Sequence, residues 1–177
     1  MTVTTITRRA AVAAAAATTA GLVMTSLPAS ADLGAPTSTA SRSVSRSPSP
    51  TPRLVDIRTG RHATFDRVVL DLRGAAPGYR VGYVDTVRQD GSGKVVDLRG
   101  QAQLLVRLTP AQAHRADGSP TYTGPKRMLV DDPELREVAL VGDFEGVVSV
   151  GLGVRAKHGF RVLTLHDPTR IAIDIAH

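Results

Sequence analysis

Two short stretches of the sequence contain an arginine and an aspartate at the same spacing. FDRVVLDL places Arg67 four residues before Asp71, and PTRIAIDI places Arg170 four residues before Asp174. A guanidinium can grip a carboxylate through two parallel hydrogen bonds, so these residue types suit either an ion pair within the protein or the binding of a charged ligand. We therefore take these four residues as the candidate ligand-binding residues of the chain.

The pattern around these residues predicts two half-buried β-strands, because apolar and polar side chains alternate. Residues four apart on a strand face the same way but lie about 13 Å from each other, so neither pair can make a direct contact within its own strand. If the two strands pair antiparallel, Arg67 faces Asp174 and Asp71 faces Arg170. If the strands lie in different sheets, each pair marks an outer face.

Short runs of this kind fill the chain from Leu54 onward, separated by Gly, Pro and Asp. The predicted strands cover residues 54–58, 65–72, 79–87, 95–98, 103–108, 128–130, 136–142, 147–154, 160–165 and 170–175. Many short strands with turn residues between them predict an all-β fold, either a sandwich or a barrel, and about 120 residues suffice for one core. One short helical turn is expected near 110–114, because Pro110 suits the first position of a helix.

The N-terminal residues predict an export signal. Arg8 and Arg9 precede a run of Ala, Val and Leu, and small residues follow up to Ala31, after which cleavage is expected. The paired arginines fit the twin-arginine route, with the general secretory route as the alternative. An uncleaved membrane anchor is less favoured, because the run is rich in Ala and Thr. We thus expect removal of residues 1–31, no stable membrane span afterwards, and an extracellular or wall-associated protein.

Residues 32–53 are rich in Ser, Thr and Pro and contain almost no large apolar side chain. Such a segment cannot bury enough surface to offset the entropy lost on ordering. We therefore expect a disordered linker here, followed by a single domain over residues 54–177.

The composition excludes several classes of function. The sequence has no cysteine, which excludes disulfides, cysteine-based zinc sites and cysteine nucleophiles. The formal net charge is +6, but residues 54–177 hold 17 basic against 15 acidic side chains. A domain this close to neutral lacks the charge distribution of a nucleic-acid-binding protein.

No arrangement of polar residues indicates catalysis. The five histidines do not follow zinc-binding spacings, and no G-x-S-x-G motif is present. His114 near Asp117 could form half of a site, but a loop histidine near an aspartate is common. The acidic stretch 131–134 is interpreted as a solvated turn, with a weak calcium site as the less favoured alternative. We therefore expect a protein that is not an enzyme and needs no cofactor or metal.

The segments GRHATFDRVVLDL, PGYRVGYV, GDFEGVVSVGLGV and FRVLTLHDPTRIAIDI, after an export signal and a linker, resemble an AMIN-like domain of the actinobacterial exported type. The resemblance covers essentially all of residues 54–177 and points to the AMIN domains of cell-wall amidases and secretins. It implies an antiparallel β-sandwich of two small sheets, with the Arg and Asp motifs on the outer faces of both sheets. It also implies a non-catalytic module that binds peptidoglycan or another wall polymer through Arg67, Asp71, Arg170 and Asp174.

An envelope protein-protein interaction module is the alternative function. The longest irregular segment, residues 109–127, would then supply the binding surface, because long loops in compact domains are often functional. The partner would be a protein of the envelope in this case, and neither function involves nucleic acid.

Overall fold

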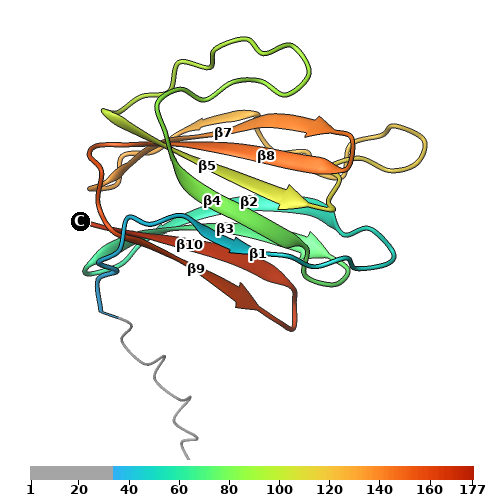
Figure 1. Ribbon diagram of the computed structural model, residues 1–177, viewed down its shortest axis with the longest axis horizontal. Coiled ribbons are helices and arrows are strands. Elements are labelled where there is room, and N and C mark those ends of the chain that lie inside the picture. The colour runs from blue at the N-terminus through green and yellow to red at the C-terminus, as the bar shows by residue number, and fades with distance from the viewer. Residues whose placement is uncertain (1–33) are drawn as a thin grey trace, which may run out of the picture. The chain divides into compact units, whose positions relative to one another are not determined.

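Residues 34–177 are the part of the chain that the computed structural model describes, and within them ten β-strands form two antiparallel sheets without any helix. Figure 1 shows the sheets as two stacked layers. This arrangement confirms the predicted antiparallel β-sandwich. The export signal predicted for residues 1–31 lies outside the described residues. Over the described range, the chain has no helix that could span a membrane.

The larger sheet has six strands in the order β1-β4-β5-β8-β7-β6. Their bounds, in that order, are β1 (Arg42–Val44), β4 (Gly78–Val84), β5 (Ala102–Thr109), β8 (Val147–Val154), β7 (Leu135–Phe144) and β6 (Arg127–Leu129). Every neighbouring pair runs antiparallel. The two short strands β1 and β6 therefore form the edges, where an exposed strand offers little backbone for further pairing.

The smaller sheet has four strands in the order β2-β3-β10-β9. Their bounds are β2 (Arg53–Arg61), β3 (Phe65–Arg73), β10 (Arg170–Ala176) and β9 (Phe160–Leu165). The last strand of the chain, β10, lies between β3 and β9 and pairs with both. The sheet is therefore complete only when the C-terminal residues are in place.

One hydrophobic core fills the space between the sheets. The isoleucines of β10 are fully buried and belong to one cluster with the alternate apolar residues of β3, β5 and β8, namely Ile171, Ile173, Ile175, Val68, Leu70, Leu104, Val106, Leu108, Val148, Val150 and Leu152. Burying a side chain of this size contributes about 1.5 to 3 kcal/mol. The intervening residues of each strand face outward, as period-two alternation requires.

The connection between β4 and β5, residues 85–101, lies across the outer face of the six-stranded sheet (Figure 1, light green). Val87 and Leu98 from this segment form a second, smaller buried cluster with residues of β7. The segment can approach closely because β8 has glycine on this face: a Cβ on Gly151 would lie 3.0 Å from both Val87 and Leu98. The predicted strand at 95–98 is therefore wrong, because Val96 and Leu98 pack onto a sheet face instead of pairing within a sheet, and Val95 forms only an isolated bridge with Arg88.

The helical turn expected near residues 110–114 is also absent from the described structure. The backbone of this segment is extended and hydrogen-bonds to distant segments: Leu54 N donates to Gln112 O, Gln112 N donates to Pro52 O, and Ala111 N donates to Gly146 O. Ala111 and Ala113 are buried in the core. Pairing across the two sheets thus replaces the local hydrogen bonds that a helix would need.

The segment before Arg53 also differs from the disordered linker expected over residues 32–53. Its strand β1 pairs with β4, and the carbonyl of Ser38 accepts a hydrogen bond of 2.9 Å from the backbone of Phe160. Composition missed this order because an edge strand is held by main-chain hydrogen bonds, which do not require large apolar side chains.

Candidate functional site

The two Arg/Asp stretches form the central pair of the four-stranded sheet. In the antiparallel register of β3 and β10, Arg67 lies opposite Asp174 and Asp71 lies opposite Arg170, as predicted for antiparallel pairing. Both motifs therefore lie on one outer face of one sheet. The expectation that they occupy the outer faces of two different sheets is wrong for this chain.

Asp174 is fully buried on this outer face because two arginines cover it. Arg67 donates to both carboxylate oxygens, from Nε at 2.5 Å and from Nη2 at 2.9 Å. Arg161 of β9 adds a third hydrogen bond, from Nε at 2.6 Å. The hydrogen bond with Asp174 raises the pKa of Arg67. Asp174 thus joins β3, β10 and β9 through charge-assisted hydrogen bonds, which are the stronger kind.

Both guanidinium groups of this network also lie near an aromatic ring. The Cζ atom of Arg161 is 4.7 Å from the ring centroid of Phe65, and that of Arg67 is 5.2 Å away. Phe65 is itself buried and stacks on His62 with a centroid separation of 4.4 Å. A cation at this distance from a ring is attracted by about 0.5 to 2 kcal/mol, so the ring reinforces the ion network.

Asp71 has a different partner from the one that the strand register suggests. Its carboxylate binds Arg58 of β2, from Nε at 2.5 Å and from Nη2 at 2.9 Å. The hydrogen bond with Asp71 raises the pKa of Arg58. Arg170, although opposite Asp71, donates from Nε to the carbonyl of Pro168 at 3.1 Å. Half of the Arg58 side chain is exposed, at 51%, so this second pair lies in a much wetter environment than the first.

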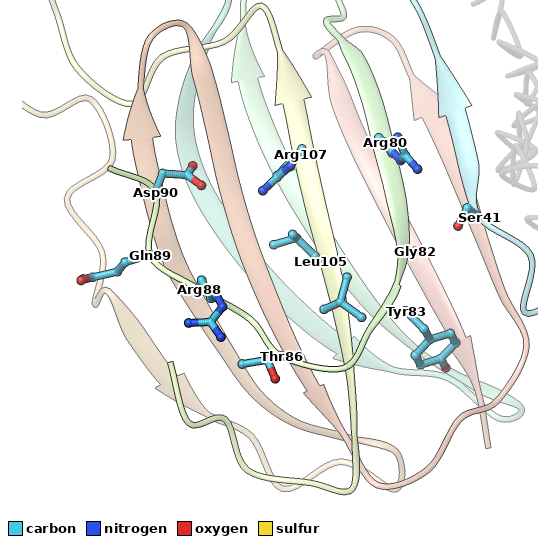
Figure 2. Close-up of a pocket in the computed structure, with 11 residues that line it drawn as sticks. Ser41, Arg80, Gly82, Tyr83, Thr86, Arg88, Gln89, Asp90, Leu105 and Arg107 are labelled. Atoms are coloured by element: carbon cyan, nitrogen blue, oxygen red, sulfur yellow. The ribbon is translucent and has the colours of Figure 1, made fainter. Parts of the chain in front are cut away.

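A groove lies on the opposite side of the molecule, on the outer face of the six-stranded sheet (Figure 2). Its volume is about 460 Å³. Arg80 of β4 and Arg107 of β5 are direct register partners and project from neighbouring strands in Figure 2. Residues 86–90 of the long connection form one wall, and Leu105 lies in the floor between them and β4.

The charges of this groove are unbalanced. Three arginines and one aspartate line it, namely Arg80, Arg88, Arg107 and Asp90. Arg88 donates from Nη1 to the carbonyl of Gly93 at 3.0 Å. No described residue forms an ion pair or a side-chain hydrogen bond with either Arg80 or Arg107, and both side chains are exposed. Sequence reasoning missed this pair because Arg80 lies opposite Arg107 only in the observed register of β4 and β5. That register depends on the connection between the two strands, residues 85–101.

Two buried carboxylates at one end of the sandwich are used internally. Asp66 Oδ2 accepts hydrogen bonds from the backbone of Glu134 at 2.7 Å and of Leu135 at 2.9 Å. Glu134 Oε1 accepts one from the backbone of Ala156 at 2.8 Å, and its Oε2 lies 3.2 Å from Nδ1 of His158. The interpretation of residues 131–134 as a solvated turn is therefore wrong for Glu134, which is buried.

The histidine within the long segment 109–127 also has a partner of its own. His114 lies 2.6 Å from Asp143 of β7, between Nδ1 and Oδ2, and not against Asp117. Asp117 instead accepts hydrogen bonds from the backbone and hydroxyl of Ser119, which lower its pKa. In residues 34–177, no group of three or more His, Asp or Glu side chains could hold a metal ion.

These features define a β-sandwich module with Arg-Asp pairs on one face and an arginine-lined groove on the other. A family model for the AMIN-like domain matches residues 52–177, and the chain therefore belongs to the AMIN-like domain family. Membership in this family indicates a non-catalytic module associated with the cell envelope. Comparisons with curated proteins and with solved structures give no match.

Proposed function

We propose that this protein is an exported, non-catalytic module that binds peptidoglycan through the outer face of its four-stranded sheet. The observation that carries the proposal is the position of the Arg/Asp strands: in an AMIN-like domain, they lie side by side at the centre of one sheet with their charges outward. Peptidoglycan stem peptides carry carboxylates, which arginine binds in a bidentate way.

The four candidate residues divide into two roles. Asp71 and Arg170 contact the ligand, because Asp71 pairs with the half-exposed Arg58 and Arg170 makes only an exposed hydrogen bond to a backbone carbonyl. Arg170 uses Nε for the Pro168 carbonyl, which leaves its terminal nitrogens for a ligand carboxylate. Arg67 and Asp174 act as positioning residues that fix β3 against β10.

Cosedimentation with purified peptidoglycan tests this proposal. Arg170→Ala is the informative variant, since it removes a candidate contact without opening the buried Asp174 network. Arg155→Ala is the matched control, because this arginine is exposed and its side chain makes no hydrogen bond or ion pair with other described residues. We expect Arg170→Ala to reduce the bound fraction several-fold and Arg155→Ala to leave it unchanged. Absence of binding, or equal binding by both variants, contradicts the proposal.

Export follows from the same function, because peptidoglycan lies outside the cytoplasm. We propose cleavage after Ala31. Mass spectrometry of the protein recovered from the culture medium or wall fraction should give a mature chain that begins at Asp32. Recovery of a chain that retains Arg8 and Arg9 would favour the uncleaved anchor.

An envelope protein is the second candidate partner, favoured by the exposed tip of residues 115–119. Arg115 donates to the hydroxyl of Ser119 at 3.1 Å and to the carbonyl of Pro120 at 2.9 Å, so the tip is preorganised. Tyr122, just beyond it, is buried in the core. Crosslinking in the native envelope, with and without replacement of residues 115–119 by a glycine linker, tests this function. One dominant protein partner that disappears with the tip would favour it over wall binding.

A further inference from the structure

The arginine pair in the groove is unfavourable for the isolated protein. Arg80 and Arg107 are direct partners on adjacent antiparallel strands, and like charges directly opposite each other destabilise a sheet. No described acidic side chain forms an ion pair with either of them. By contrast, Arg67 on the other sheet is fully paired. A local cost in stability is a common counterpart of function, so this unpaired arginine pair is a candidate binding surface.

The geometry lets both arginines reach one anionic group. Opposed residues of an antiparallel pair have Cα atoms about 4.5 to 5.5 Å apart, and their side chains lie on the same face. Two planar guanidinium groups that start this close together can both donate to the oxygens of a single carboxylate or phosphate. Figure 2 shows the two side chains on neighbouring strands in the upper part of the groove with their ends pointing apart, so rotation about the side-chain bonds brings both guanidinium groups to one oxyanion.

The groove continues past Arg107 into a second hollow. Arg107 and Asp90 line both hollows. The second hollow adds Thr109, Glu145 and Phe144, and Phe144 is 53% exposed. An exposed aromatic ring beside hydrogen-bonding groups offers a surface for the flat face of a ligand ring.

The wall formed by residues 86–90 is fixed in place, so the groove exists before any ligand binds. Val87 is fully buried beneath it, and its backbone N donates to the side-chain carbonyl of Gln103 at 2.7 Å. Asp90 N donates to Val141 O at 3.2 Å. A preformed site loses less conformational entropy on binding than one that must be ordered.

We propose that this groove is a binding site for a sugar that bears an oxyanion. Arg80 and Arg107 bind the carboxylate or phosphate, and Phe144 contacts the sugar ring. The site is separate from the face proposed to bind peptidoglycan and does not depend on that function. It uses residues outside both Arg/Asp stretches.

Three sugars that share one ring test the proposal by NMR titration of the amide signals. N-acetylmuramic acid bears a carboxylate, N-acetylglucosamine 1-phosphate bears a phosphate, and N-acetylglucosamine bears neither. We expect at least one charged sugar to shift signals of β4 and β5 around Arg80 and Arg107, and to bind at least tenfold more tightly than N-acetylglucosamine. The charged sugar that binds more tightly shows whether the site prefers a carboxylate or a phosphate.

Variants locate the site. The double variant Arg80→Gln with Arg107→Gln should weaken binding of the charged sugar at least tenfold, and Arg155→Gln should change it less than twofold. Phe144→Ala should weaken binding of the charged sugar but not of acetate or inorganic phosphate. Thermal unfolding is the control for folding: because the double variant removes two like charges from opposed positions of β4 and β5, its Tm should equal or exceed that of the parent.

Two results would overturn the site: equal binding of charged and uncharged sugars, or a double variant that binds within twofold of the parent. Absence of binding by both charged sugars would overturn it as well. These failures are distinguishable from failure of the wall function, because cosedimentation with peptidoglycan reports on Arg170 and the titration reports on Arg80 and Arg107.

Discussion

The four-stranded sheet contains two bidentate Arg-Asp pairs with nearly the same geometry but different exposure, and we expect their removal to have different effects. Arg67 binds Asp174 at 2.5 and 2.9 Å, and Arg58 binds Asp71 at 2.5 and 2.9 Å. Asp174 is fully buried, and the Arg67 side chain is 22% exposed. Arg58, in contrast, is 51% exposed. We compare Asp174→Ala with Asp71→Ala.

The magnitude for Asp174→Ala follows from what the substitution leaves behind. It removes three charge-assisted hydrogen bonds, two from Arg67 and one from Arg161, and leaves the largely buried Arg67 guanidinium without its counter-charge. Removing one partner from a buried ion pair costs about 3 to 5 kcal/mol. Asp71→Ala breaks a pair that solvent already screens, so we expect a loss of about 1 kcal/mol or less.

Thermal and urea unfolding monitored by circular dichroism measure both effects. With about 3 °C per kcal/mol for a domain of this size, Asp174→Ala should lower Tm by about 9 to 15 °C and Asp71→Ala by about 3 °C or less. The double variant Arg67→Ala with Asp174→Ala should lose less than the sum of the single variants, because the two residues interact directly. Equal losses for Asp174→Ala and Asp71→Ala would refute the argument that burial decides the energy of these pairs.

Three further predictions concern packing, the buried carboxylate and pH. Gly153→Ala places a Cβ against the carbonyl of Arg99 and should destabilise the 85–101 segment by about 1 to 3 kcal/mol, whereas Gly60→Ala, with no atom within 4 Å of the new Cβ, should be neutral or slightly stabilising in urea unfolding. Asp66→Ala leaves the backbone N–H groups of Glu134 and Leu135 buried without acceptors, so it should cost about 2 to 5 kcal/mol in the same assay; a loss below 1 kcal/mol would contradict this role. Burial raises the pKa of Tyr83 to about 12, while its hydroxyl donates to the carbonyl of His158 at 2.7 Å. Because an unfolded tyrosine titrates near pH 10, the folded state retains a proton between about pH 10 and 12 that the unfolded state has lost. The free energy of unfolding should therefore fall as the pH rises through this window, and less steeply in Tyr83→Phe; parallel pH profiles for the two proteins would exclude this explanation.

Most of the sandwich can be predicted from the sequence because its signals are local. Alternation of apolar and polar residues places nine of the ten strands near their observed positions, including the C-terminal strand with Ile171, Ile173 and Ile175 inward. The exception, β1, is held by backbone pairing with β4 and has no hydrophobic period to detect. The segment 95–98 has apolar residues for another reason, since it packs on the glycines of β8.

The sites depend on neighbours that local patterns do not specify. The pairing of Arg67 with Asp174 follows from the antiparallel register alone. The second partner of Asp174, Arg161, could not be predicted, because the position of β9 beside β10 is a property of the whole topology. The facing of Arg80 and Arg107 requires the register of β4 and β5 across a connection of 17 residues, 85–101, that contains no strand of its own.

The repeated spacing of Arg and Asp also has a consequence for how the four candidate residues should be tested. Two identical Arg-x-x-x-Asp stretches are self-complementary when they pair antiparallel, because each arginine then lies opposite the aspartate of the other strand. A shift of two residues would retain the buried face but separate Arg67 from Asp174, the pair that these two strands form with each other. The spacing therefore fixes the register of β3 and β10, whether or not these residues also bind a ligand. One of the two possible pairs is then broken by a third strand, because Arg58 of β2 takes Asp71 and leaves Arg170 with a backbone carbonyl. A loss of binding in Arg67→Ala or Asp174→Ala would follow from a disturbed register as well as from a lost contact, whereas a loss in Arg170→Ala at unchanged stability can come only from the ligand.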